Sequence, residues 1–296
     1  MARPSASQAA SYGALLDAVR GVQWRARRAV TNAIAGTHHS TQRGTSAEFT
    51  EYRLYRQGDD PRRLDWRVLA RSDRAYIRLA TDRAVLPTTI VIDASASMAY
   101  PVGGATKWRF AVNLAVGLAA AAHAGGDPVG LAVAGREGSP ATLAPRTRRG
   151  VVAEIAHVLD TVEPGGTTPL APVVAALRTA RIALITDLLG DADGALHAAR
   201  IHAVGGGEFH LIHVVAAEEI DPPRRPLLAV DPERSEMRRM LLETTRAAYE
   251  SRFAEWRSDM AHRWRAAGAA YTEVRTDEAA AHAVRRVAEP AGGIQR

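Results

Sequence analysis

The chain has 296 residues, of which 47% are hydrophobic, enough to build the core of one large domain or two smaller ones. It contains no cysteine, so disulfides, thiolate nucleophiles and cysteine-based zinc sites are excluded. The net charge of +6 raises the question of nucleic-acid binding. The arginines, however, occur as scattered pairs, and only 5% of the residues are aromatic, so we expect no nucleic-acid partner.

No segment has the pattern of a membrane span or a secretory signal. The most apolar run, residues 110–124, is too short to cross a bilayer and contains Asn113 and His123. The first residues lack a basic patch followed by an apolar block. These features predict a cytoplasmic protein without a transmembrane segment.

The N-terminal part predicts an accessory segment over residues 1–85. Residues 11–34 carry apolar side chains at near-helical spacing with arginines between them, which predicts one or two amphipathic helices. These helices are expected to pack on the body of the protein, and peripheral association with a membrane surface stays open. Residues 35–49 are rich in Gly, Ser and Thr and are typical of a loop.

From residue 86 the pattern becomes α/β. Short β-branched runs alternate with helical stretches, and this alternation predicts a mostly parallel sheet with helices on both faces over residues 86–290. The expected strands are TTIVID (88–93), PVGLAVAG (128–135), RIALITD (181–187), FHLIHVV (209–215) and AAYTEVRT (269–276). The expected helices span about 107–124, 148–162, 169–180, 191–204, 235–267 and 277–289, and residues 217–235 form a Pro-rich insertion.

The first of these strands ends on a run of oxygen-bearing side chains. Asp93, Ser95 and Ser97 recur at every second residue, so a semi-extended backbone would point all three side chains the same way. Oxygen-only ligands suit a hard divalent cation such as Mg²⁺. The alternative is that Ser95 or Ser97 caps a helix, and the short pattern by itself leaves both interpretations open.

Two more loops on the same side of the sheet supply further oxygens. Thr167 lies in the glycine-rich turn PGGTTPL, and Asp187 ends the strand ALITD. In this order and at these intervals, Asp93, Ser95, Ser97, Thr167 and Asp187 resemble the metal-ion-dependent adhesion site of von Willebrand factor A domains. The resemblance implies a von Willebrand factor A-like, Rossmann-like fold and a bound Mg²⁺, with Mn²⁺ or Ca²⁺ as alternatives.

Residues 47–78 carry a second resemblance. They are similar to the segment that precedes this domain in domain-of-unknown-function family fifty-eight, whose members are partners of MoxR-type AAA+ ATPases. The matching positions are Glu48, Phe49, Arg53, Tyr55, Gly58, Asp59, Asp60, Arg62, Asp65, Trp66, Ala70 and Arg71. The resemblance implies a MoxR-type ATPase as the partner, and a role in assembling or activating other proteins.

The run from Gly58 to Trp66 within this segment has two interpretations. Gly58 and Pro61 favour a turn, the arginines can pair with the neighbouring aspartates, and Trp66 offers an apolar anchor. A structural tether and a partner-binding surface both fit this composition. Its acids are left out of the candidate metal site, because their distance from the carboxyl edge of the sheet does not follow from sequence.

The sequence therefore predicts a non-enzymatic, metal-dependent adaptor of a MoxR-type ATPase, which binds an acidic side chain of its partner or of a client protein. A magnesium-dependent hydrolase is the first alternative, because two aspartates also hold magnesium in phosphoryl-transfer sites. No P-loop signature supports that alternative. An arginine-rich binder of nucleic acid or of a membrane surface is the second and weaker alternative.

Overall fold

A computed structural model describes residues 6–27, 35–39, 49–57, 59, 61, 64–72, 74–80, 83–101, 106–135, 141–224, 227–230 and 238–289. The chain divides into two compact units, one formed by Met1–Arg25 together with Pro87–Arg296 and the other by Ala26–Leu86. This grouping differs from the expected boundary at residue 85, because the first 25 residues belong to the larger unit. Each unit is described separately below.

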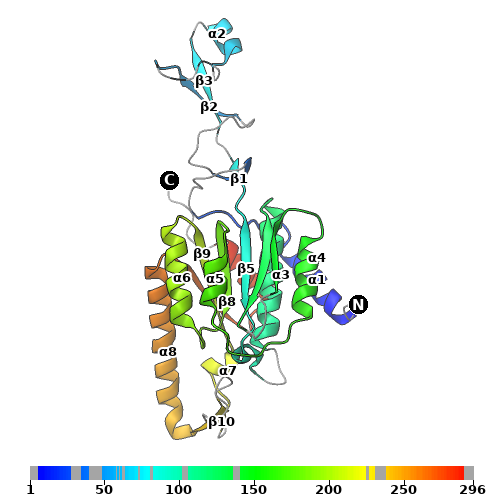
Figure 1. The fold of residues 1–296 in the computed structure, drawn as a ribbon, viewed down its shortest axis with the longest axis vertical. Helices are drawn as coiled ribbons and strands as arrows, with labels where there is room; N and C mark the ends of the chain where they lie inside the picture. Colours follow the sequence, from blue (N-terminus) through cyan, green and yellow to red (C-terminus); the bar gives the residue numbers. More distant parts are fainter. Residues whose placement is uncertain are drawn as a thin grey trace. The chain divides into compact units, whose positions relative to one another are not determined.

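The larger unit is built around a six-stranded sheet with the order β12-β9-β8-β5-β6-β7 (Figure 1). Five strands are parallel, and β7 pairs with β6 in the antiparallel sense at one edge. The strands are β5 (Thr88–Asp93), β6 (Val129–Ala134), β7 (Thr142–Arg146), β8 (Arg181–Thr186), β9 (Glu208–Val215) and β12 (Ala270–Arg275). The mostly parallel sheet predicted from the sequence is thereby confirmed.

The strand order reverses beside β5. The chain passes from β5 to β6 on one side and later returns to β8 on the other side of β5. Ligands of open α/β sheets bind where the strand order reverses in this way, outside the carboxyl ends of the strands. The end of β5 is therefore the position at which a site is expected.

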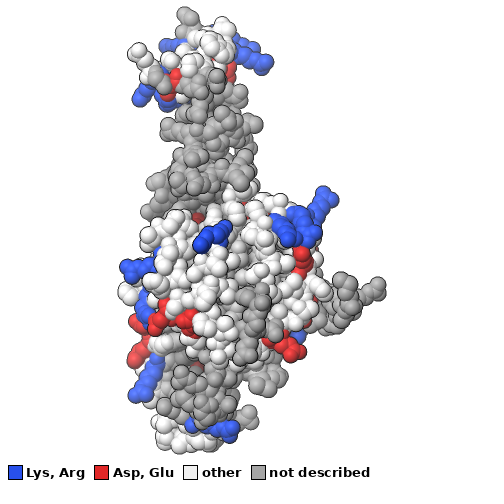
Figure 2. Space-filling model, viewed as in Figure 1, with Lys and Arg blue, Asp and Glu red and all other residues white. Residues whose placement is uncertain are grey.

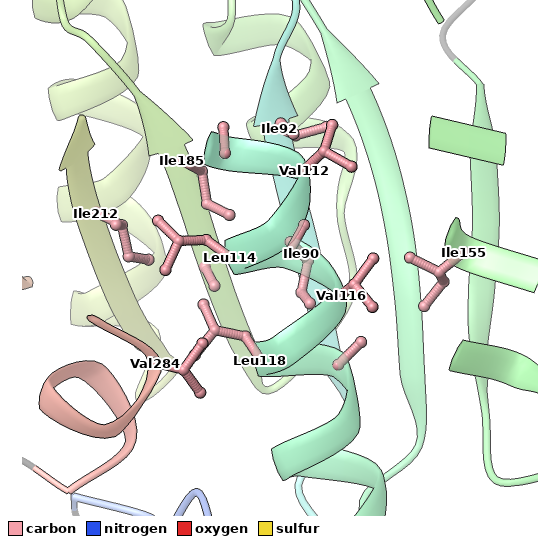
Figure 3. Packing of buried hydrophobic residues seen from close by; sticks show 14 of the residues in the cluster. Ile90, Ile92, Val112, Leu114, Val116, Leu118, Ile155, Ile185, Ile212 and Val284 are labelled. Carbon is pink, nitrogen blue, oxygen red and sulfur yellow. The ribbon is translucent and has the colours of Figure 1, made fainter. Parts of the chain in front are cut away.

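One face of the sheet is covered by α1 (Ala6–Ala18), α3 (Lys107–Ala124), α4 (Val151–Asp160) and α9 (Ala280–Ala288). The buried, strongly apolar helix α3 lies at the centre of this layer. Its Leu114 faces Ile185 and Ile212 of the sheet, Leu118 lies beside Val284 of α9, and Val116 faces Ile155 of α4 (Figure 3). Because α3 begins at the carboxyl edge of the sheet, this packing also fixes the position of its first residue.

The other face is covered by α5 (Ala171–Ala176), α6 (Ala192–Val204) and α8 (Glu243–Ala266). Trp264 of α8 is fully buried and stacks on Phe209 of β9. Trp256 lies two helical turns earlier and packs against the same core. The two tryptophans therefore act as core residues of the layer.

The N-terminal segment is tied to the amino edge of the sheet by a buried arginine. Arg181, the first residue of β8, pairs with Asp127 at 3.4 Å and with Glu208 at 3.3 Å, and its Nη2 donates to the carbonyl oxygen of Trp24 at 3.2 Å. The guanidinium also lies 4.7 Å from the ring of Trp24. Because Trp24 is 1% exposed, these contacts hold the first residues of the chain on the larger unit.

Helix α1 is shorter than the predicted helical region. It ends at Ala18, and the chain then runs through a turn to Trp24 without helical structure. Leu15 of α1 and Val19 and Val22 of the irregular segment after it all pack into the core. The apolar positions predicted to form one helical face are therefore buried, although the helix ends before two of them. Residues 28–34 of the predicted helices lie outside the described residues.

Three elements lie between β9 and α8. They are α7 (Ala217–Ile220) and the antiparallel pair β10 (Leu227–Val230) and β11 (Arg238–Leu241). The helix predicted from residue 235 begins at Glu243, because residues 238–241 pair with β10 instead. The predicted insertion at residues 217–235 thus contains α7 and the first strand of this hairpin.

Within its described residues, the smaller unit contains two antiparallel pairs and one short helix. β1 (Ala35–His39) pairs with β4 (Arg83–Ala84), and β2 (Phe49–Leu54) pairs with β3 (Tyr76–Ala80). The helix α2 spans Trp66–Ser72. The loop predicted at residues 35–49 therefore includes the strand β1 at its start.

The predicted turn before α2 is held by aspartates. Arg53 donates to Asp59 at 2.7 Å, and Asp65 accepts hydrogen bonds from the Tyr52 hydroxyl and from the amides of Arg67 and Val68. Trp66 is 65% exposed, so it does not serve as the apolar anchor that we expected. Gly58, Asp60, Arg62 and Arg63 of this motif lie outside the described residues.

Candidate functional site

The first part of the candidate site is the end of β5. Every residue of this strand is buried, and Asp93 is 2% exposed. Its Oδ1 accepts a hydrogen bond from the amide of Ser95 at 2.9 Å, which turns the chain sharply after the strand. A short 3₁₀ helix (Ala96–Ala99) follows.

The two serines do not cap this helix. Ser95 occupies the capping position, but its side chain makes no capping hydrogen bond. Instead, the hydroxyl oxygens of Ser95 and Ser97 lie 3.1 Å apart. Contrary to the prediction, the backbone is not semi-extended over the whole motif, because it becomes helical at Ala96. The structure nevertheless brings the two hydroxyls together just after Asp93.

The second acidic strand end lies beside the first. Since β5 and β8 are parallel and Ile92 pairs with Ile185, Thr186, the last residue of β8, lies at the level of Asp93. The Thr186 hydroxyl donates to Oδ2 of Asp93 at 2.7 Å. Asp187 comes next and is 1% exposed, so the structure brings both predicted acids to the same edge of the sheet.

The turn after Asp187 has a strained backbone. Leu188 has φ of 60°, the only positive φ of a non-glycine residue among the described residues. Its amide donates to the Thr186 hydroxyl, and the amide of Leu189 donates to Oδ1 of Asp187. Such strained positions cluster at functional sites, and here the turn fixes the direction of the Asp187 carboxylate.

The loop that carries Thr167 is fastened to the same edge by backbone hydrogen bonds. The amide of Gly165 donates to Ala94 O at 2.7 Å, and the amide of Ala96 donates to Gly166 O at 3.0 Å. Thr167 itself is exposed, whereas the four other predicted ligands are buried. Of the five predicted ligands, Thr167 is thus the one open to solvent.

Gly135, at the end of β6, allows the parts of the site to approach closely. Its φ is 85°, and a Cβ atom at this position would lie 2.3 Å from Oδ1 of Asp93 and 2.8 Å from the amide nitrogen of Ser95. Its carbonyl oxygen also accepts from the amide of Thr168. A side chain here would therefore displace the acid and the loop after it.

A buried lysine completes the site, and the sequence reasoning missed it. Lys107 is the first residue of α3 and is fully buried. Its Nζ donates to Oδ2 of Asp187 at 2.6 Å and to Oε1 of Glu219, on α7, at 2.8 Å. The signal available in the sequence was that the one lysine of the chain stands at the start of a largely apolar helix.

The charges of the site perturb one another. Burial raises the pKa of Asp93 to about 6, and the charge of Asp187 adds to this shift, while hydrogen bonds from Thr186 and Ser95 oppose it. Burial by itself would lower the pKa of Lys107, but the charges of Asp187 and Glu219 outweigh it, so this pKa is raised. Asp187 thus has a cationic partner within the chain, whereas none of the described lysine or arginine side chains forms an ion pair with Asp93.

The donor set fits a hard divalent cation. Two carboxylates and two neutral hydroxyls meet at one edge of the sheet, and all of their donor atoms are oxygens. Within the described residues, no three His, Asp or Glu side chains lie together as a metal site. A cation bound at Asp93 would therefore need the serine hydroxyls as additional ligands. Asp93, Ser95 and Ser97 would be the direct ligands, and Asp187 would act beside them.

The comparisons with known proteins come from sequence and from structure. A family model described as "Protein of unknown function DUF58" matches residues 51–259. The uncharacterized proteins Rv1480 of Mycobacterium tuberculosis and Mb1516 of Mycobacterium bovis are each 31% identical over 120 residues, which is 40% of this chain. The matched region spans 38% of the length of each of these relatives.

Two solved structures are similar at low identity. BatB from Bacteroides thetaiotaomicron is 18% identical with a TM-score of 0.43, and the match covers 67% of this chain and 95% of that one. An aerotolerance-related membrane protein from Bacteroides fragilis is also 18% identical with a TM-score of 0.43, over 68% and 95% of the two chains. The mostly parallel sheet with a helix layer on each face is the α/β architecture predicted from the sequence.

The described helices lack the features of a membrane span. None of them combines sufficient length with the apolar character that crossing a bilayer requires.

Proposed function

We propose that this chain, which belongs to the DUF58 family of proteins of unknown function, is a non-catalytic module. It binds a carboxylate of a partner protein through a divalent cation. The observation that carries this proposal is the meeting of Asp93, Ser95 and Ser97 with Asp187 beside the strand-order reversal at β5. The residues belong to two separate segments, and rigid strand ends hold them.

Each residue has a defined part in this proposal. Asp93 supplies a carboxylate, and Ser95 and Ser97 supply neutral oxygens, so the direct ligands carry little negative charge. Thr186 and the amide of Ser95 orient the Asp93 carboxylate from two sides. When bound, the cation would offer a coordination position to an oxygen from outside the chain. Thr167, predicted as a ligand, is exposed, and its hydroxyl would contact the ion or the partner from the loop fastened to this edge of the sheet.

The partner proposed is a MoxR-type AAA+ ATPase, on the strength of the resemblance described above, and a cytoplasmic location goes with it. A nucleic-acid partner has less support. In the face of the larger unit drawn in Figure 2, basic side chains are separated by acidic and uncharged ones and do not form a continuous stripe.

The test is binding of a MoxR-type ATPase to the full chain with and without a chelator. Wild type should retain the ATPase in Mg²⁺ and lose it in chelator, and Asp93→Asn should fail to retain it in either condition. Asp193→Asn is the matched control, because Asp193 is an exposed aspartate whose partner is Arg263. Equal recovery from all samples would contradict the proposal.

The hydrolase alternative is tested in the same preparation. A magnesium-dependent hydrolase should turn over a generic phosphoester such as para-nitrophenyl phosphate, and the turnover should be lost in Asp93→Asn. We expect no turnover by any variant. Turnover that follows the Asp93 carboxylate would replace the binding proposal with a catalytic one.

A further inference from the structure

Lys107 is the only lysine in a chain that has 38 Lys and Arg residues. All the other Lys and Arg positions are arginines. A lysine at position 107 therefore does not follow from the overall composition of the chain. A guanidinium is a broad planar fork, whereas an ammonium is a compact point charge that fits between two carboxylates. The single lysine is buried and donates to both Asp187 and Glu219.

The charges around this lysine are unbalanced. Asp187 and Glu219 pair with one ammonium, and the charge of Asp187 also acts on Asp93. These three carboxylates and one lysine carry two net negative charges when all are ionised. Asp93 itself forms no ion pair with a described lysine or arginine. One divalent cation at Asp93 would balance the cluster.

The lysine and a divalent cation would also compete. Both are positive, so they repel each other strongly in a buried site, and both are attracted to Asp187. While Lys107 holds Oδ2 of Asp187 at 2.6 Å, that oxygen is shielded from the cation. A cation that draws Asp187 towards itself must therefore weaken the bond to Lys107.

Glu219 makes this exchange possible without leaving a buried ammonium alone. Its Oε1 accepts from Lys107 at 2.8 Å, and its Oε2 accepts from the amide of Ala216 at 2.8 Å. The hydroxyl of Tyr249, on α8, donates to the carbonyl oxygen of Glu219. The acid is thus fixed independently of Asp187, and Lys107 would stay paired after Asp187 had turned away.

We propose that Lys107 is a built-in cation that competes with the divalent ion for Asp187 and thereby sets the ion affinity of the site. This inference rests on the proposed function and deepens it, because it says what regulates the same site. By holding Asp187 back, Lys107 leaves the ion with Asp93 as its one direct carboxylate, which keeps the ion available to a carboxylate from outside. Glu219 is the positioning residue that holds Lys107 ready.

The first experiment uses the wild-type chain, since labelling with ¹⁵N-lysine gives signals from Lys107 alone. Adding Mg²⁺ should shift the Lys107 side-chain signal, and chelator should reverse the shift. The same addition should leave the signal of Asp93→Asn unchanged. A wild-type signal that does not move, in a sample shown by calorimetry to bind the ion, would overturn the inference while leaving the proposed function intact.

The second experiment measures Mn²⁺ affinity by calorimetry. Lys107→Met removes the competing charge and should bind Mn²⁺ roughly tenfold tighter or more, because a like charge near the ion is lost. Glu219→Gln loosens the lysine from α7 and should lower affinity, since Lys107 then depends more on Asp187. Lys107→Arg keeps the charge and should not tighten binding. Circular dichroism shows which variants are folded. If Lys107→Met does not fold, the affinity of Glu219→Gln still decides the test.

The outcomes separate the two proposals. Equal Mn²⁺ affinities of wild type and Lys107→Met would contradict the proposed role of Lys107 and leave the proposed function standing. Binding by Lys107→Met but not by wild type would support that role and contradict ion-dependent function in the native chain. Folded wild type and Lys107→Met that both fail to bind Mn²⁺ would contradict both.

Discussion

The hydroxyl of Thr186 donates to Oδ2 of Asp93 across 2.7 Å, so the last residue of β8 supports the acid that ends β5. The same hydroxyl oxygen accepts from the amide of Leu188 at 3.1 Å. One side chain thus joins the two acidic strand ends and steadies the strained turn after Asp187. Neither end of the site can be repositioned without affecting the other.

Replacing this threonine with valine keeps its shape and removes both hydrogen bonds. Thr186→Val should lower the free energy of unfolding by about 1–3 kcal/mol, the usual cost of leaving buried polar groups without partners. It should also weaken Mn²⁺ binding, because Asp93 loses the bond that orients it. Denaturant unfolding and calorimetry measure the two effects. Thr161→Val, at an exposed helix end, is the control and should change neither.

Gly135→Ala tests whether the close approach at the end of β6 is required. The new Cβ would lie 2.3 Å from Oδ1 of Asp93, so we expect loss of Mn²⁺ binding together with reduced stability. Gly150→Ala is the matched control, because Gly150 has a similar φ of 88° and nothing within 4 Å of the position that its new methyl group would take. The control should cost only about 1–2 kcal/mol from the left-handed backbone. Equal effects of the two variants would show that backbone strain alone is responsible.

Arg181→Met tests the clamp at the opposite edge of the sheet. It removes the guanidinium from two buried carboxylates, Asp127 and Glu208, and from the carbonyl oxygen of Trp24. Loss of one partner from a buried ion pair costs about 3–5 kcal/mol, so a large decrease in unfolding free energy is expected. Arg178→Met, on an exposed arginine, should have little effect. Limited proteolysis should also release the N-terminal residues faster from Arg181→Met.

His202 should make stability depend on pH. Burial lowers the pKa of this imidazole below its ordinary value of about 6.5, with backbone groups opposing the shift. The unfolded chain therefore binds more protons than the folded one as the pH falls below about 6.5, and stability should decrease there. His202→Gln cannot be protonated, so its unfolding free energy should fall less between pH 7.5 and pH 5. The exposed His197→Gln should keep the wild-type dependence.

The sequence predicted the sheet well because its strands are buried on both faces. TTIVID and RIALITD are continuous β-branched or apolar runs, and all six residues of β5 and of β8 are buried. β7 was missed, because Thr142–Arg146 is a short edge strand with alternating exposure and a proline at position 145. β11 was assigned to a helix, because it lies directly before α8 and the predicted helix was extended across it.

The sequence predicted where the two acids and the two serines of the candidate site lie, but not what surrounds them. The spacing of Asp93, Ser95 and Ser97 follows from residues close in sequence, and the end of β8 placed Asp187. Lys107 meets Asp187 across 80 positions of sequence, and Glu219 meets Lys107 across 112, so neither contact leaves a local pattern. The burial of the cluster likewise depends on loops that only the folded chain brings together.

The residues Ala26–Leu86 are inserted between two stretches that belong to one unit, Met1–Arg25 and Pro87–Arg296. The chain therefore leaves that unit and comes back to it, and Trp24 is secured before the departure by Arg181. A protease that cuts within the inserted stretch would sever the polypeptide without detaching its first helix. The two fragments should then migrate together under native conditions and separate only in denaturant.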